Sequence, residues 1–270
     1  MMKRITILFS FLICTFFGWT QKDSSFIFIK KIKGDITKFN VDQLDNIYLL
    51  SSTDQLKKID ANGDSVAIFN NIRRHGKVSY IDVSNPMRVL LYYKDFATIV
   101  ILDRLLNIRT TIDLRQQNIL QVQAVGLSYD NKIWLYDEWD HKLKKIDEDG
   151  KLLFETADFR QLFNEAFSFT SIFDKDGYLY LYDEQKGVYV FDYYGSLKRK
   201  IPFTAMKNFK ATGKYFFGIK NDSLFRYQTD ILFSKEMPLP PSLRQASSIH
   251  FNSSFVYALK NDGLEIYLLK

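Results

Sequence analysis

A short run of aromatic and aliphatic residues recurs six times along this chain, and the recurrence constrains the fold more than any other feature. The copy at residues 178–182, for example, alternates Tyr and Leu. One residue near the centre of each copy measures the period, and these residues are Tyr48, Leu90, Trp134, Tyr180, Phe217 and Tyr257. Their spacings are about 42, 44, 46, 37 and 40 residues. Strand-forming sequence that repeats every 40 to 45 residues or so indicates an array of small β-sheets.

A second strand and a tight turn follow each of the first four copies. Asp60, Asp147 and Asp192 are each followed three residues later by glycine, and after Asp103 we expect Asn107 to replace that glycine one residue late. An Asp side chain accepts hydrogen bonds from turn amides, and Gly adopts positive φ. With one strand before each copy and one after the turn, a repeat has four strands. The sequence therefore predicts an all-β fold, a six-bladed β-propeller.

The two ends of the sequence complement each other in this scheme. The last repeat has only three strands, because the sequence stops at Lys270, whereas residues 25–30 form a spare strand before the first repeat. We expect this N-terminal strand to complete the sixth blade and to close the ring, so that neither end leaves an unpaired sheet edge.

The first twenty residues have the pattern of a signal peptide. Lys3 and Arg4 precede an apolar run over residues 5–19, and polarity begins at Gln21. A helix of that run would span only about 22 Å of a bilayer core of about 30 Å, although an uncleaved anchor is the alternative. We predict a signal peptide at residues 1–20 and a propeller domain at residues 21–270. The single cysteine, Cys14, would leave with the signal, which excludes disulfides and cysteine-based sites.

The order of strand, Asp-x-x-Gly turn and strand resembles the NHL/YncE-like group of six-bladed propellers. The likeness covers about residues 22–270. A polar Gln at the start of the mature chain is similar to exported propeller proteins of the Bacteroidota. The NHL/YncE-like group contains lyases, lactonases and many binding proteins, so the resemblance implies a fold without implying an activity.

Two loops on one face of the predicted ring carry the richest chemistry. These candidate binding residues are Asp137, Glu138, Trp139, Asp140 and His141 in blade three, with Asp183 and Glu184 in blade four. Adjacent carboxylates can hold a hard cation, and an exposed Trp can stack on a sugar or on a partner's side chain. The alternative is that the acidic residues only solubilise the loops while Trp139 packs between blades.

Two further segments are candidates for contacts with a partner. Asp158 can cap a short amphipathic helix that carries Phe159 and Phe163, inserted between blades three and four on the same face. This helix is either a lid over the core or an apolar docking ridge. Arg73, Arg74 and His75 form a basic cluster between blades one and two. This cluster either pairs with an acidic partner or a lipid phosphate, or it is a solvated turn.

The sequence contains no recognisable catalytic or cofactor motif. Histidines at metal-ligand spacing, a nucleophile motif and a Gly-rich phosphate loop are all absent, so we expect no metal and no cofactor. Four scattered residues are the best candidates for a cation in the central channel, namely Asn46, Asp82, Asn85 and Asp130. The net charge of +6 includes Lys3 and Arg4, and the remaining lysines are dispersed, which argues against nucleic acid as the partner.

These observations favour an exported, non-catalytic interaction or scaffold module of the bacterial cell envelope. We expect a periplasmic, outer-membrane-associated or extracellular protein with no transmembrane span in its mature chain. Its partner would be another envelope protein, and it would act as an accessory subunit of an outer-membrane complex. The alternatives are a lactonase-type hydrolase or lyase with a channel cation, and a carbohydrate-binding propeller.

Overall fold

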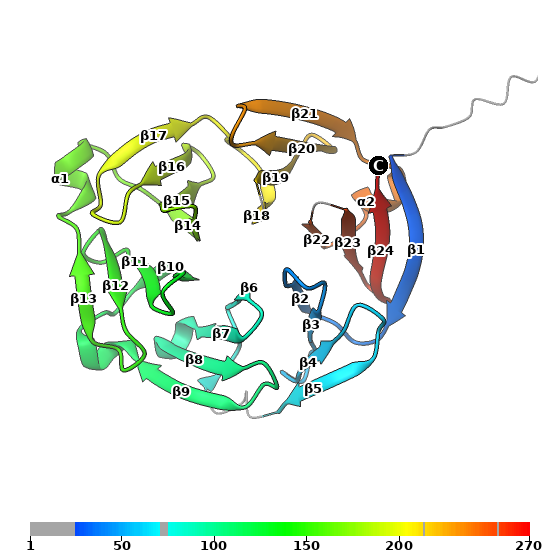
Figure 1. Cartoon of the computed structure of the whole chain (residues 1–270), viewed down its shortest axis with the longest axis horizontal. Helices are drawn as coiled ribbons and strands as arrows, with labels where there is room; N and C mark the ends of the chain where they lie inside the picture. Colours follow the sequence, from blue (N-terminus) through cyan, green and yellow to red (C-terminus); the bar gives the residue numbers. More distant parts are fainter. Residues whose placement is uncertain (1–24, 71–74, 213, 253) are drawn as a thin grey trace, which may run out of the picture.

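The computed structural model describes residues 25–70, 75–212, 214–252 and 254–270. Within these ranges, six four-stranded antiparallel sheets are arranged around a central axis as the blades of a propeller, as Figure 1 shows. The six-bladed all-β propeller is therefore confirmed. The predicted signal peptide at residues 1–20 and the basic pair Arg73 and Arg74 lie outside the described residues. No helix in the described part of the chain is long and apolar enough to cross a membrane.

The first three blades follow the chain from the inner strand to the outer strand. Blade one contains β2 (Lys38–Val41), β3 (Ile47–Leu50), β4 (Leu56–Ile59) and β5 (Ser65–Phe69). Blade two contains β6 (Tyr80–Asn85), β7 (Arg88–Tyr93), β8 (Thr98–Asp103) and β9 (Ile108–Asp113), with short 3-10 helices at Lys94–Phe96 and Leu114–Gln117. Blade three contains β10 (Val122–Leu127), β11 (Ile133–Asp137), β12 (Lys142–Ile146) and β13 (Leu152–Glu155).

The remaining blades repeat this order, except that the last blade takes its outer strand from the start of the described chain. Blade four contains β14 (Phe169–Lys175), β15 (Tyr178–Asp183), β16 (Gly187–Phe191) and β17 (Leu197–Ile201), and helix α1 (Phe159–Phe163) precedes it. Blade five contains β18 (Lys207–Thr212), β19 (Tyr215–Lys220), β20 (Ser223–Gln228) and β21 (Phe233–Pro238), followed by α2 (Pro241–Arg244). Blade six contains β22 (Ser248–Phe251), β23 (Phe255–Lys260), β24 (Gly263–Leu269) and β1 (Phe26–Lys33).

The strand β1 is the outer strand of blade six and pairs antiparallel with β24. Phe26 lies opposite Leu269 and Lys33 lies opposite Gly263, with a register shift between Phe28 and Lys30. The Lys30 ammonium donates to the carbonyl oxygen of Ala61 at 3.0 Å, in the outer turn of blade one. The first strand of the described chain thus contacts both the last blade and the first blade.

The hydrophobic core lies between the blades rather than within one layer. The buried apolar residues of the described chain form six clusters, one at each junction of neighbouring blades. Middle strands such as β7 and β16 are buried at every position, because both faces of their sheet pack against another blade. Outer strands such as β17 are mostly exposed. The continuous apolar runs of the sequence are therefore strands buried on two faces.

The Asp-x-x-Gly turns form as predicted in blades one, three and four. In blade one, Asp60 Oδ1 accepts the amides of Gly63 and Asp64, both at 2.9 Å, and Gly63 has φ of +104°. The prediction for blade two was wrong in one detail. Leu106, with φ of +62°, occupies the position of the glycine, whereas Asn107 follows it and donates its side-chain amide to Asp103 at 3.0 Å.

Candidate binding groove of blade three

The loop between β11 and β12 presents Trp139 on a rigid base. Asp137 ends β11 and lies opposite Lys142, which begins β12. The Asp137 side chain is fully buried, and its Oδ1 accepts the amide of Trp139 at 3.1 Å. His141 closes the loop in a left-handed conformation, with φ of +53°. The Trp139 residue remains 69% exposed although its backbone is fixed.

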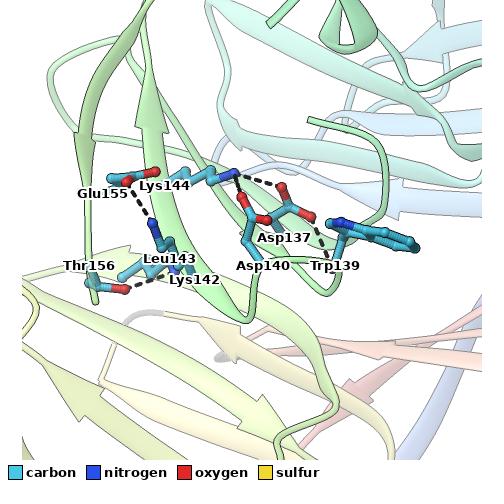
Figure 2. A network of polar contacts seen from close by, with 8 residues as sticks. All are labelled: Asp137, Trp139, Asp140, Lys142, Leu143, Lys144, Glu155 and Thr156. Carbon is cyan, nitrogen blue, oxygen red and sulfur yellow. Dashed lines mark hydrogen bonds and ion pairs between the residues drawn. The ribbon is translucent and has the colours of Figure 1, made fainter. Parts of the chain in front are cut away.

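A buried lysine contacts both acidic residues of this loop, as Figure 2 shows. The Lys144 ammonium is 2.7 Å from Asp137 Oδ2 and 2.5 Å from Asp140 Oδ2, and only 4% of the Lys144 residue is exposed. Burial on its own would lower the pKa of Lys144, but its hydrogen bonds to Asp137 and Asp140 outweigh burial and raise that pKa. The cation and two carboxylates therefore fix both ends of the loop around Trp139.

An open groove of about 510 Å³ runs beside this loop. Its lining residues are Trp139, Asp140, Lys142, Ala157, Asp158, Arg160 and Gln161. Lys142 pairs with Glu155 at 2.7 Å, and Arg160 pairs with Asp158 at 2.7 Å. The hydrogen bond from Arg160 lowers the pKa of Asp158. The groove combines one exposed aromatic ring with charges that already have partners, so it suits a neutral or mixed-charge surface better than a single ion.

Helix α1 forms one wall of the groove and covers the core beneath it. The Asp158 side chain accepts the amide of Arg160 at 2.8 Å, which caps the helix as predicted. Phe159 is fully buried and stacks on Phe191 with 5.1 Å between ring centroids. Phe163 is half-buried, and its ring centroid lies 5.3 Å from that of Phe159. The aromatic side of the helix thus faces inward as a lid, and only Leu162 (53% exposed) offers an apolar surface outside.

The other predicted residues of this face do not converge on one point. Asp183 is buried, and it accepts the amides of Ser168 and Gln185 at 2.9 Å each. Glu184 in the same loop is exposed. Glu138 accepts a hydrogen bond from Gln121 at 2.7 Å. The structure therefore makes Asp137 and Asp183 supports of their loops, and Trp139 is the large residue that reaches solvent.

The channel candidates are also engaged separately. Asp82 accepts the amides of Ser84 and of Leu127, both at 2.8 Å, so its carboxylate joins blade two to blade three. Asp130 pairs with Lys145 at 2.8 Å. The Asn46 side chain donates to Asp42, whereas the Asn85 side chain accepts the amide of Met87 and donates to Asn131 of blade three. Among the described residues there is no cluster of three or more His, Cys, Asp or Glu side chains placed to hold a metal ion.

Sequence reasoning missed Lys144, the residue that organises the loop. The position of Lys144 could have indicated its burial. It lies in β12 between Leu143 and Ile146, and both of these residues are fully buried. A lysine in such a strand needs a carboxylate partner, because an unpaired buried charge is costly. Asp137 and Asp140 are the carboxylates within reach in the same hairpin.

Comparison with known proteins identifies a fold and no family. The sequence matches no established family profile and no curated protein. A streptogramin B lyase structure has a TM-score of 0.58 at 14% identity, over 91% of this chain and 86% of that one. A catalytically inactive virginiamycin B lyase from Staphylococcus aureus, with quinupristin, has a TM-score of 0.59 at 15% identity, over 89% and 88% of the two chains.

A third similar structure is PorZ, described as an essential bacterial surface component of the type-IX secretion system of Porphyromonas gingivalis. Its TM-score is 0.58 at 13% identity, over 88% of this chain and 32% of PorZ. Identities this low support a shared architecture only. The chain is a six-bladed β-propeller with an open groove beside Trp139.

Proposed function

We propose that this protein is a non-catalytic propeller that binds a partner protein of the bacterial envelope at the groove beside Trp139. The observation that carries the proposal is that Trp139 is 69% exposed on a loop fixed by a buried cation and two carboxylates. Exposed aromatic residues dominate the binding energy of many protein interfaces. A loop that is already rigid loses little conformational entropy on binding, which favours affinity.

The setting of this function is part of the same proposal. Residues 1–20 act as a signal peptide, β1 closes the ring by completing blade six, and the chain belongs with the NHL/YncE-like propellers. The mature protein works in the periplasm or at the outer membrane, as an accessory subunit of an outer-membrane complex. Similarity in fold to PorZ, a surface component of a secretion system, supports an envelope role.

The test is affinity purification from envelope extracts with three forms of the protein. The wild-type protein should retain a stable partner, and Trp139→Ala should lose it, with affinity at least about tenfold lower, as expected for a hot-spot aromatic residue. Tyr194→Ala is the matched control, because Tyr194 is an 85% exposed aromatic residue in a different turn. Equal recovery of the partner by wild type and Trp139→Ala would remove the groove from the proposal, and a protein that recovers no partner would refute the function.

A lyase or lactonase-type hydrolase with a channel cation is the second candidate, because the two lyase structures share this fold over most of both chains. Metal analysis and a thermal shift with Ca²⁺ decide between the two functions. A protein without bound Ca²⁺ and without a Ca²⁺-dependent shift in melting temperature would eliminate the second candidate. Carbohydrate stacking on Trp139 is the third candidate, which a glycan array tests.

A further inference from the structure

The turn between β20 and β21 in blade five exposes three consecutive large apolar side chains. Ile231 and Leu232 are each 63% exposed, and Phe233 is 53% exposed. This turn has no Asp-x-x-Gly motif, unlike the same turn in blades one, three and four. Single exposed apolar residues are common on protein surfaces, whereas a contiguous group marks a contact site.

The backbone holds this apolar tip in a defined position. Gln228 and Phe233 are the last paired residues of the hairpin, so the residues between them extend beyond the sheet. The amide of Thr229 donates to the carbonyl oxygen of Lys214 at 3.0 Å, which ties the tip to the neighbouring turn between β18 and β19. Thr229 itself is buried, with 8% exposed. The three apolar side chains therefore project from a supported hairpin rather than from a loose loop.

Three cationic residues lie next to the tip. Lys214 Nζ and the Arg226 guanidinium lie 5.8 Å and 5.1 Å from the centre of the Tyr215 ring. Lys235 is exposed and lies directly opposite Arg226 in the ladder of β20 and β21. Like charges at directly opposite positions of a sheet are destabilising, so the pairing of Arg226 with Lys235 lowers the stability of the hairpin rather than adding to it.

The nearby acidic residues leave this positive charge largely uncompensated. Asp230 lies 3.8 Å from Lys214, and both side chains are 52% exposed, so solvent screens the pair. Glu236 follows Lys235 and therefore points to the other face of the sheet. Neither Arg226 nor Lys235 forms an ion pair with any residue in the described part of the chain.

We propose that this surface, formed by Ile231, Leu232 and Phe233 with Lys214, Arg226 and Lys235, inserts into the headgroup region of a bilayer that contains anionic lipid. An apolar tip flanked by cations matches that environment, because the acyl boundary takes up the apolar side chains while anionic headgroups attract the cations. A lysine or arginine that lies beside an apolar anchor also keeps its charge in the headgroup layer while its stem contacts the lipid.

The decisive experiment places an environment-sensitive fluorophore on the tip of the full chain. Cys14→Ser removes the natural thiol, and Ile231→Cys provides the labelling site. Leu105→Cys is the matched control, because Leu105 is a 49% exposed apolar residue in the corresponding turn of blade two. With vesicles of phosphatidylcholine and phosphatidylglycerol, the label at position 231 should shift to the blue, and the label at position 105 should not.

Two sets of variants test the two parts of the surface separately. The double variant Ile231→Asp with Leu232→Asp should lower partitioning onto these vesicles by at least about tenfold, because it removes the apolar anchor. The double variant Arg226→Gln with Lys235→Gln should weaken binding to anionic vesicles without changing the residual binding to pure phosphatidylcholine, and added salt should act in the same direction.

Three results would overturn the proposal. The first is the absence of a blue shift at position 231, and the second is an equal shift at positions 231 and 105, which would reflect binding by another part of the chain. The third is a concentration-dependent oligomer in vesicle-free buffer that the Ile231→Asp, Leu232→Asp variant abolishes, because the tip would then be an interface between copies of this protein. None of these results depends on the groove beside Trp139.

Discussion

Gly263 offers a direct test of whether β1 holds the ring closed. It begins β24 opposite Lys33 and has φ of +142°, a conformation that L-residues rarely adopt. A Cβ added there would overlap the carbonyl oxygen of Ile32 and lie 3.0 Å from Lys33 Cα, so alanine would force β1 away from β24. Gly34 is the matched control, because its φ is +152° and a Cβ there meets nothing within 4 Å.

The size of the effect follows from this comparison. Backbone strain should cost about 1–3 kcal/mol in both Gly263→Ala and Gly34→Ala. Displacement of the backbone of β1 should add about 1–3 kcal/mol in Gly263→Ala alone. At roughly 2–4 °C per kcal/mol for a domain of this size, Gly263→Ala should melt several degrees below Gly34→Ala. Thermal and urea unfolding measure both variants, and equal stability of the two would refute the closure of the ring by β1.

Three further predictions concern other parts of the chain. Lys144→Met should destabilise the protein by about 3–5 kcal/mol, because it leaves the buried Asp137 without a cation, whereas Asp140→Asn should cost about 1 kcal/mol or less in urea unfolding. The hydrogen bond from Lys186 lowers the pKa of Glu165 below its ordinary value of 4.5. The ionised Glu165 therefore stabilises the fold above pH 4.5, and this stabilisation is lost as the pH falls through the folded-state pKa. Glu165→Gln should flatten the acid side of a profile of melting temperature against pH. N-terminal sequencing of the exported protein should begin at Gln21; an intact N-terminus would contradict cleavage.

Blades one to five were predictable because the contacts that define each of them join residues that are close in the sequence, whereas the outer strand of blade six pairs β1 with β24. A strand buried on two faces gives a continuous apolar run, and an Asp at the start of a turn binds amides only two to four residues away, as Asp60 does. Leu106 shows the limit of this reasoning. Its positive φ arises because Asp103 and Asn107 fix the turn around it, and a leucine carries no local signal for that conformation.

The candidate site was less predictable because it depends on which charges lie inside. Asp137 and Asp140 look alike in the sequence, yet Asp137 is fully buried and the Asp140 side chain is 38% exposed. The ammonium of Lys144 lies close to both carboxylates and connects the buried Asp137 to the more exposed Asp140. Pairing between a strand residue and its own loop depends on side-chain direction, which composition and spacing do not specify.

The pairing of Phe26 with Leu269 has a consequence for the order of events as the protein is made. A chain that emerges N-terminus first releases β1 before the other described strands and β24 after them, so the outer strand of blade six has no neighbour until all the other described strands have emerged. Contacts between such distant residues form slowly, because loop closure must precede them. Closure of the ring should therefore follow the pairing of strands within blades one to five, because each of those blades consists of strands that are consecutive in the sequence.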